Sequence, residues 1–374
     1  MKLGVCTGGG DCAGLNAVLR SLVLCARTRG DTTIIGIMEG INGLAANPPR
    51  HQILFSPAGD GLGGHNGLKG LDEFVLDTLL TLGGTYLTTS NAGNPFRDAR
   101  EGAAYRADVL RGYKSLGLDG LIVIGGDGTH CIAAELRESG IQVIGIPKTI
   151  DNDYVDSELA VGFTSAVDVA TEALMRVNSS GASHGRVMVV EVMGRNAGYI
   201  ALHSGIASGA DVILLPERPF SRENLAEHLK TKVLSRKNHA LVVCAEGARA
   251  GSEGLKYRVS ASGTRQLGGI AEVVATFLHG ALKYDTRSSV LGHIQRGSQP
   301  DPVDRILAAR FATRAMRLAH EKKFGSMVVL RKGEVEVTAY PDARSRGGSA
   351  ARCLDPNDPT IIAAQDMGVY CGEA

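Results

Sequence analysis

Short apolar runs alternate along the chain with longer segments in which apolar residues recur at helical spacing. The short runs are almost continuously apolar, which is typical of parallel strands covered by helices on both faces. This alternation indicates an α/β protein built from strand–helix–strand units. We predict strands at 2–7, 32–38, 120–126, 142–147, 186–193, 211–217, 240–247 and 288–294, and helices at 98–116, 164–178, 222–235 and 301–319.

Glycine is abundant, with 49 residues, and is concentrated where the predicted strands end. Open α/β sheets bind their ligands at the carboxyl ends of the strands, so chemistry is expected there. The same order of strand, glycine-rich turn and helix occurs in both halves of the chain. It predicts two similar α/β lobes with a boundary near Gly162. From about Lys332 the alternation is lost, and the last residues have no predicted structure.

Composition narrows the classes of partner. The 374 residues include 40 basic and 39 acidic side chains. This balance argues against nucleic acid or a membrane surface as a general partner. Seven cysteines are scattered without CxxC spacing, so we expect small buried thiols rather than a disulfide framework or a zinc site. The chain starts on a strand-like segment and has no long apolar stretch, so we expect a cytoplasmic protein.

Two glycine-rich turns follow predicted strands and precede helices. The turn in CTGGGDCAGLNAVLR (6–20) would bring backbone N–H groups to a helix N-terminus, where phosphate binds well. A plain tight turn is the alternative. In LIVIGGDGTH (121–130) the glycines leave room for a polyphosphate, the threonine offers a hydroxyl, and Asp127 offers a carboxylate suited to Mg²⁺. Here the alternative is that Asp127 only caps the next helix.

A third segment, GIPKTIDNDY (145–154), follows another apolar strand and places two carboxylates around one asparagine. A sugar hydroxyl attacks phosphorus poorly unless a base takes its proton, and we assign that role to Asp151. Asp153 would orient Asp151 or the metal. Lys148 would supply positive charge, and Thr149 would donate to the moving phosphoryl group. The alternative, a turn capped by aspartates, needs none of these neighbours.

Arginines in two further segments can neutralise charge on a phosphoryl group. In EVMGRNAGYIALHSG (191–205), Arg195 follows a strand end and Gly194 at a predicted helix start, where it can stabilise charge on the transferred group. Arg186 begins the same strand. Taken alone, it would be interpreted as an arginine that forms an ordinary salt bridge. Glu246, at another strand end, can accept hydrogen bonds from sugar hydroxyls.

The segment DTRSSVLGHIQRGSQPDPVDRILAARFA (285–312) has a histidine and two arginines close together. We place Arg287, His293 and Arg296 along one predicted strand and its exit. Bidentate and charge-assisted hydrogen bonds from such a set suit a phosphomonoester. Alone, His293 would be interpreted as a histidine of the core.

In order, GGDGT, PKTIDND, MGRNAGYIA and LGHIQRGSQPDPVDRILAARFA resemble the 6-phosphofructokinases, and the resemblance runs from about residue 1 to 330. It implies two Rossmann-like three-layer α/β lobes with mainly parallel sheets and an active site in the cleft between them. It also implies phosphorylation of the 1-hydroxyl of fructose 6-phosphate with Mg²⁺. The larger, phosphoryl-donor lobe would comprise residues 1–162 and about 295–345. The smaller, fructose 6-phosphate lobe would comprise residues 163–294. Residues from about 346 to 374 would form a C-terminal tail of uncertain placement.

Carried over position by position, the resemblance assigns roles to single residues. Asp151 becomes the proton acceptor and Asp127 the magnesium site. Arg186 and Arg287 match a pair that, in the family's tetramers, reaches the sugar phosphate of a neighbouring subunit, which implies a homo-oligomer with shared sites, a tetramer or a dimer. The implied donor site is Gly9, Gly126, Asp127, Gly128, Thr129 and Lys148. The implied sugar site is Thr149, Asp151, Met193, Gly194, Arg195, Glu246, His293 and Arg296.

Two residues, Lys148 and Gly128, favour different phosphoryl donors. Lys148 resembles the pyrophosphate-using branch of the family. Gly128 stands where those enzymes usually carry an aspartate, and it leaves room for an α-phosphate. We therefore expect ATP, with pyrophosphate as the alternative. Two remoter alternatives are an NAD- or lipid-kinase-like enzyme, which would not need PKTIDND or GHIQRG, and an inactive regulatory subunit, which commonly lacks the base or the arginines.

Overall fold

The structure is a computed structural model of the chain, and it describes all residues except 58–68, 91–92, 260–264, 342–351 and 374. The chain divides into two compact units. Unit 1 comprises Met1–Thr149, Tyr154–Ser165 and Arg296–Ala350. Unit 2 comprises Ile150–Asp153, Ala166–Gln295 and Ala351–Ala374.

Unit 1 is built on an eight-stranded sheet. Its strands are β1 (Lys2–Thr7), β2 (Thr33–Ile37), β3 (His51–Ser56), β4 (Lys69–Gly70), β5 (Gly120–Gly125), β6 (Val143–Pro147), β13 (Ser326–Arg331) and β14 (Glu334–Ala339). They lie in the order β14-β13-β6-β5-β1-β2-β3-β4. The five strands from β13 to β2 are parallel, and β14, β3 and β4 are added at the two edges as antiparallel strands.

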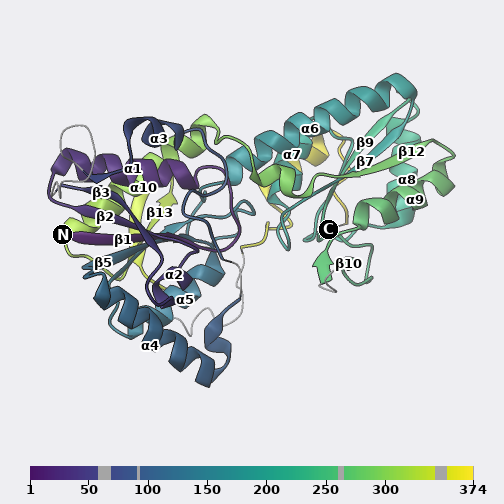
Figure 1. Cartoon of the computed structure of the whole chain (residues 1–374). Helices are drawn as coiled ribbons and strands as arrows, with labels where there is room; N and C mark the ends of the chain where they lie inside the picture. Colours follow the sequence, from purple (N-terminus) through teal and green to yellow (C-terminus); the bar gives the residue numbers. More distant parts are fainter. Residues whose placement is uncertain (58–68, 91–92, 260–264, 342–351, 374) are drawn as a thin grey trace. The chain divides into compact units, whose positions relative to one another are not determined.

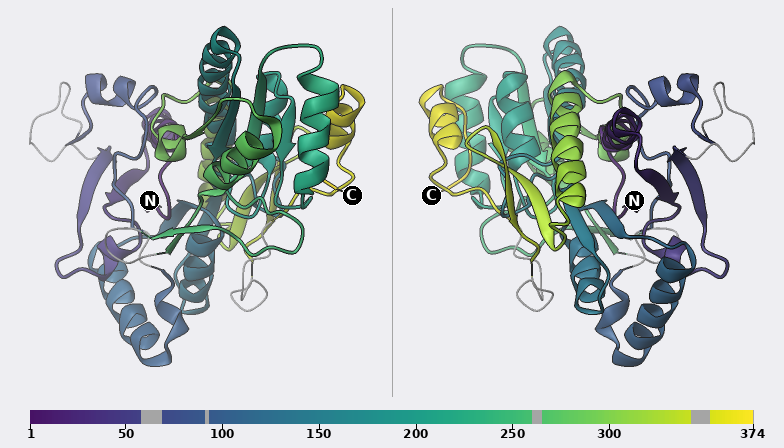
Figure 2. Two further views of the ribbon diagram at one scale, coloured as in Figure 1. Left: turned by 90° about the vertical axis from the view of Figure 1, so that its right-hand side faces the viewer. Right: turned by 90° about the vertical axis from the view of Figure 1, so that its left-hand side faces the viewer.

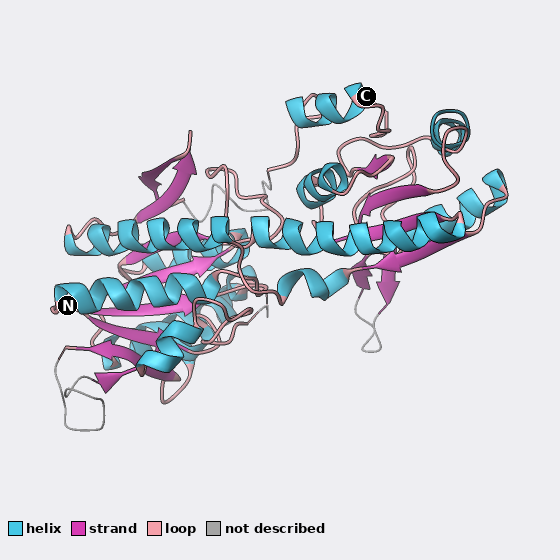
Figure 3. Cartoon of the chain, turned by 90° about the horizontal axis from the view of Figure 1, so that it is seen from above, coloured by secondary structure: helices cyan, strands magenta, loops and turns pink. Residues whose placement is uncertain are grey.

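Helices cover both faces of this sheet (Figure 1). α1 (Leu15–Arg29) and α10 (Pro302–His320) pack side by side on one face, as the view from above shows (Figure 3). The other face buries Ile37, Leu121 and Val143 of the strands with Val109 and Leu136 of the covering helices. The remaining helices of unit 1 are α2 (Asn42–Ala45), α3 (Glu73–Thr78), the 3₁₀ helix Pro95–Arg97, α4 (Ala99–Ser115) and α5 (Asp127–Glu138).

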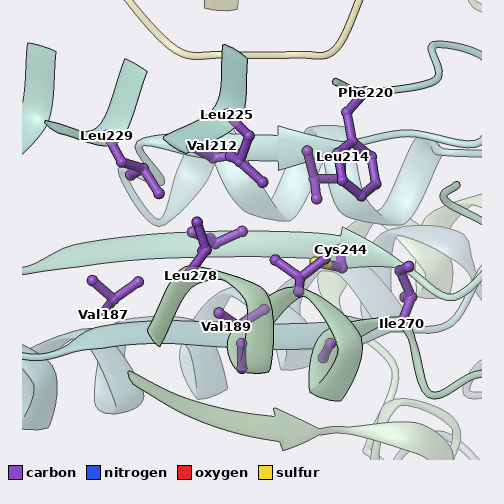
Figure 4. Close-up of a cluster of buried hydrophobic side chains, with 14 of the residues drawn as sticks. Val187, Val189, Val212, Leu214, Phe220, Leu225, Leu229, Cys244, Ile270 and Leu278 are labelled. Atoms are coloured by element: carbon purple, nitrogen blue, oxygen red, sulfur yellow. The ribbon is translucent and has the colours of Figure 1, made fainter. Parts of the chain in front are cut away.

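Unit 2 has a four-stranded, wholly parallel sheet in the order β12-β7-β9-β8. Leu225 and Leu278 of two helices face Val189, Val212 and neighbouring strand residues in a buried cluster on one side of it (Figure 4). The strands are β7 (Val187–Val192), β8 (Val212–Leu214), β9 (Ala240–Ala245) and β12 (Thr286–Val290), with a separate antiparallel pair β10 (Tyr257–Val259) and β11 (Arg265–Leu267). The helices are α6 (Phe163–His184), α7 (Tyr199–Ala207), α8 (Arg222–His228), a π-helical turn Leu229–Val233, α9 (Ile270–Leu282), the 3₁₀ helix Gly292–Arg296 and α11 (Pro359–Asp366).

The C-terminal residues belong to unit 2, where α11 packs beside α7 (yellow in Figure 2). The backbone of Tyr370 pairs with the start of β8, since Ile213 N donates to Tyr370 O at 2.8 Å. Buried Arg218 donates to the carbonyl oxygens of Pro356, Cys371 and Gly372. Backbone pairing and one arginine therefore hold a segment for which the sequence indicated no structure.

The predicted α/β class with mainly parallel sheets is confirmed, but the second half of one predicted strand is wrong. The segment 288–294 was expected to be extended, whereas β12 ends at Val290 and residues Gly292–Arg296 form a 3₁₀ helix. Gly292 has φ +50°, a left-handed conformation that ends the strand. His293 therefore lies on a 3₁₀ turn, where it is exposed, which excludes the alternative of a core histidine. The hairpin β13–β14 and α9 were not predicted.

No helix in the described part of the chain is long and apolar enough to cross a membrane.

Candidate active site

Three loops of unit 1 follow the carboxyl ends of neighbouring parallel strands, because β1, β5 and β6 lie side by side in the sheet. They are the glycine loop after β1, the turn Gly126–Thr129 after β5, and Lys148–Thr149 after β6. Backbone bonds join them: Gly8 N donates to Ile124 O at 2.9 Å, and Lys148 N to Gly125 O at 2.9 Å. The structure thus brings the predicted donor residues together.

The close approach of these loops requires glycine. A Cβ atom at Gly8 would lie 2.5 Å from the Thr129 methyl carbon, and one at Gly125 would lie 2.5 Å from Thr129 Cβ. Gly9 has φ +78°, and a Cβ there would be 3.4 Å from Thr129 Oγ1 and 3.7 Å from Lys148 Nζ. The backbone of the first loop therefore lies close to the Thr129 hydroxyl and the Lys148 ammonium group.

Two cations hold the glycine loop after β1. Lys148 is only 3% exposed and donates from Nζ to the carbonyl oxygen of Gly10. Arg296 donates from Nη1 to Asp11 O at 2.9 Å, and a Cβ at Gly10 would lie 2.4 Å from that nitrogen. The sequence places Arg296 among the sugar-binding residues, and in the structure its Nη1 contacts the first glycine loop of its own unit.

Asp127 is the first residue of α5, and its helix cap is Gly126. The carboxylate therefore lies in the first turn of α5, one residue after the cap position. The first turn of α5 presents backbone N–H groups and the positive end of the helix dipole at the loop. A Cβ added at Gly128 would meet no described atom within 4 Å, so the space beside Asp127 is open.

Asp151 is 6% exposed and lies on Ile150–Asp153, a short segment that belongs to unit 2. Thr149, the residue before this segment, ends the first part of unit 1, and its N–H donates to Val161 O at 3.1 Å. Asn152, between the two aspartates, has φ +52°. This left-handed conformation is costly for a residue other than glycine and is often found at functional sites.

The loop Met193–Gly198 follows β7 in unit 2 and carries Arg195, whose side chain is exposed. Arg195 was expected at a helix start, but α7 begins only at Tyr199, and Arg195 has φ +51°. Glu246 holds this loop, because its Oε1 accepts from Arg195 N at 2.8 Å and from Gly194 N at 3.3 Å. Burial raises the pKa of Glu246. One oxygen of Glu246 is therefore engaged by backbone rather than by ligand.

Arg186 and Arg287 meet at one carboxylate that the sequence did not single out. Arg186 Nε donates to Asp285 Oδ2 at 2.6 Å, and Arg287 Nη2 lies 3.2 Å from Asp285 Oδ1. The parallel pairing of β12 with β7 places Arg287 opposite Met188 and so puts both arginines at the same end of the sheet. The hydrogen bond from Arg186 lowers the pKa of Asp285, which keeps it ionised between the two arginines.

A pocket of about 550 Å³ lies elsewhere in unit 2 and contains none of the predicted site residues. It is lined by His228, Thr231, Lys232, Arg236, Gln365, Met367, Gly368, Val369, Tyr370 and Cys371.

Comparison with known proteins identifies relatives over the whole chain. A family model described as phosphofructokinase matches residues 2–319. ATP-dependent 6-phosphofructokinase 1 of Nostoc sp. is 38% identical over 376 residues, which cover 100% of this chain and 99% of that protein. ATP-dependent 6-phosphofructokinase 1 of Synechocystis sp. is 41% identical over 334 residues, or 88% of each chain. The chain is also similar to the crystal structure of a pyrophosphate-dependent phosphofructokinase from Nitrosospira multiformis, with a TM-score of 0.78. The match covers 100% of this chain and 92% of that one at 20% sequence identity, so it shows a likeness of fold alone.

Proposed function

The chain belongs to the phosphofructokinase family, and on that premise we propose that it is an ATP-dependent 6-phosphofructokinase of glycolysis. It transfers the terminal phosphoryl group of ATP to the 1-hydroxyl of fructose 6-phosphate. The relatives from Nostoc sp. and Synechocystis sp. are ATP-dependent and match this chain over most of their length. One structural observation carries the proposal. The loops after β1, β5 and β6 in unit 1, which are suited to binding phosphate, come together around Lys148.

The donor phosphates bind at these loops. Backbone N–H groups at the start of α5 supply hydrogen bonds, and the helix dipole favours the negative charge. Gly9, with φ +78°, brings the first glycine loop close to the phosphates. Lys148 supplies a buried positive charge, and Thr129 supplies a hydroxyl. Gly126 lets the backbone approach the donor, and Gly128 leaves space for the α-phosphate of a nucleotide.

The residues present fit Mg²⁺. Magnesium in kinases usually keeps several waters and is held by one or two carboxylates together with substrate phosphates. Asp127 is such a carboxylate at the donor loop, and the described residues contain no cluster of three or more His, Cys, Asp or Glu that would form an all-protein cage. When bound, the ion neutralises charge on the phosphate oxygens.

Asp151 accepts the proton of the attacking 1-hydroxyl, and Asp153 orients it. The hydroxyl becomes a competent nucleophile only as this proton leaves. Thr149 donates to the phosphoryl group in transfer, and Arg195 neutralises the charge that develops on it. Fructose 6-phosphate is further held by Met193, Gly194, Glu246, His293 and Arg296.

Arg186 and Arg287 act on a sugar phosphate bound to another copy of the chain, in a homotetramer or a dimer. Their shared partner, Asp285, supports this proposal because it fixes both guanidinium groups at one surface position, ready for bidentate phosphate recognition. We place the enzyme in the cytoplasm, where glycolytic sugar phosphates are made and consumed.

The test is turnover of fructose 6-phosphate by the purified chain with each donor in turn. ATP should give fructose 1,6-bisphosphate and ADP, with weak or absent turnover from pyrophosphate. Turnover from pyrophosphate with none from ATP would show that Lys148, rather than Gly128, decides the donor. No turnover with either donor would favour a regulatory subunit or a different kinase.

A further inference from the structure

Three residues near the C-terminus, Arg352–Leu354, contact both loops of unit 2 that carry the proposed chemistry. They lie beyond residues 2–319, which the family model matches. They follow 342–351, which lie outside the described residues, and precede the segment held by Arg218. We name them the tail strap.

The strap binds the segment that carries Asp151. The backbone N–H of Arg352 donates to Asp153 O at 2.7 Å. The guanidinium of Arg352 donates from Nη2 to Asn152 O at 3.0 Å. The carbonyl groups of both residues that follow Asp151 are thus bonded to a single residue of the tail.

The strap also binds the loop that carries Arg195. The Arg352 guanidinium lies over the Tyr199 ring, 4.9 Å from its centroid, and Tyr199 donates from its hydroxyl to Cys353 O at 3.3 Å. The thiol of Cys353 donates to Asn196 O at 3.7 Å.

Glu217 completes the connection, since its Oε1 accepts both from Leu354 N at 3.0 Å and from Gly198 N at 2.9 Å. One carboxylate oxygen therefore joins the end of the strap to the start of α7.

Each loop contains a non-glycine residue in the left-handed region, Asn152 at φ +52° and Arg195 at φ +51°. Such conformations are costly and persist only where surrounding contacts determine them. Arg352 bonds the carbonyl of Asn152 directly, while Glu246 bonds the N–H of Arg195. The side chain of Arg352 contacts the Asp151 segment through Asn152 O and the first residue of α7, directly after the Arg195 loop, through the Tyr199 ring.

We propose that Arg352 is a positioning residue for phosphoryl transfer, holding the Asp151 segment in a fixed geometry relative to the Arg195 loop. The proposal rests on the function proposed above for Asp151 and Arg195. Misplacement of a reacting group by about 1 Å can cost a factor of about 100 in rate. Loss of the Arg352 side chain therefore acts on kcat, while binding of ATP at the loops of unit 1 is unchanged.

The experiment compares Arg352→Met, Arg352→Lys and Tyr370→Phe in the full-length chain. Arg352→Met should lower kcat about 10- to 100-fold with KM for ATP within about twofold. Hydrogen–deuterium exchange should be about tenfold faster in peptides covering Ile150–Asp153, because a charged donor is lost. Arg352→Lys, which keeps the cation and a donor, should give intermediate values.

Tyr370→Phe is the matched control, because it removes tail bonds to Ser221 N and Glu373 without touching either loop. It should keep the wild-type kcat and exchange. Wild-type kcat and exchange in Arg352→Met would overturn the proposal, as would an equal loss of kcat in Tyr370→Phe. If Arg352→Met does not fold, the proposal is overturned when Arg352→Lys has the same kcat as Tyr370→Phe.

An inactive wild-type chain would instead contradict the proposed function, and the exchange comparison would still decide the role of Arg352.

Discussion

Lys148 donates a hydrogen bond from Nζ to the backbone carbonyl of Gly10, so the residue after β6 holds the glycine loop after β1. The two residues are 138 positions apart in sequence. The same nitrogen lies 3.7 Å from the position that a Cβ at Gly9 would occupy. Lys148 therefore has two tasks in our proposal, to shape the donor loop and to attract its phosphates.

Replacing Lys148 by glycine should lower kcat about 10- to 100-fold, since a buried, charge-assisted hydrogen bond is lost. The donor should remain ATP, because the lysine attracts any polyphosphate and Gly128 is unchanged. Lys148→Met is the control for lost volume. Steady-state kinetics with ATP and with pyrophosphate measures both effects, and a change of donor in Lys148→Gly would refute this division of roles.

Replacing Gly128 by aspartate should abolish ATP turnover. The new carboxylate would occupy the open space next to Asp127 and repel the α-phosphate. Gly128→Ala adds volume without charge and should retain activity, since a Cβ there meets no described atom within 4 Å. Both variants are compared by kcat/KM for ATP. Full ATP turnover by the aspartate variant would show that the α-phosphate lies elsewhere.

Replacing Asp151 by serine should lower kcat by ~10²–10⁴, the contribution expected of a general base. KM for fructose 6-phosphate should change much less, because other residues hold the sugar. Asp156→Ser is a suitable control, since that carboxylate lies further along the chain near Arg331. Wild-type turnover in the serine variant of Asp151 would exclude it as the base.

Hybrids should reveal sites shared between subunits. An Asp151→Ser chain and an Arg287→Ala chain are each expected to be poorly active, one lacking the base and the other a phosphate ligand. Reassembled mixtures should regain activity, because some sites then combine an intact base with an intact arginine. Arg176→Ala, which removes only an exposed pair with Glu172, is the control partner. Mixtures no more active than their parents would mean that each chain builds its site alone.

The pKa of Glu246 predicts a pH-dependent stability. Burial raises this pKa in the folded protein above its ordinary value of 4.5. The folded chain therefore binds the proton more tightly than the unfolded chain, and wild-type stability falls as pH rises from the unfolded pKa through the raised folded pKa. Glu246→Gln lacks this titration. Its Tm minus that of the wild type should increase between about pH 4 and about pH 7, and a flat or falling difference would contradict the assignment.

The fold class, the main strands and the loops suited to phosphate chemistry could be predicted from the residues alone. These features are local, since apolar runs mark buried parallel strands and glycines mark the turns that follow them. The helix from Pro302 could be predicted in the same way, from an aspartate cap, a proline in the first turn and apolar spacing.

The side chains that hold these loops could be identified only in the folded chain. Asp285 joins Arg186 to Arg287 because β12 pairs with β7, a neighbour that no local pattern reveals. Arg352 and Arg218 bond to backbone carbonyl groups far away in sequence, and any residue can offer a carbonyl, so the sequence contains no signal for these contacts. The attachment of the tail and the contacts of Arg296 with the first glycine loop were therefore set by long-range packing, not by the local pattern of residues.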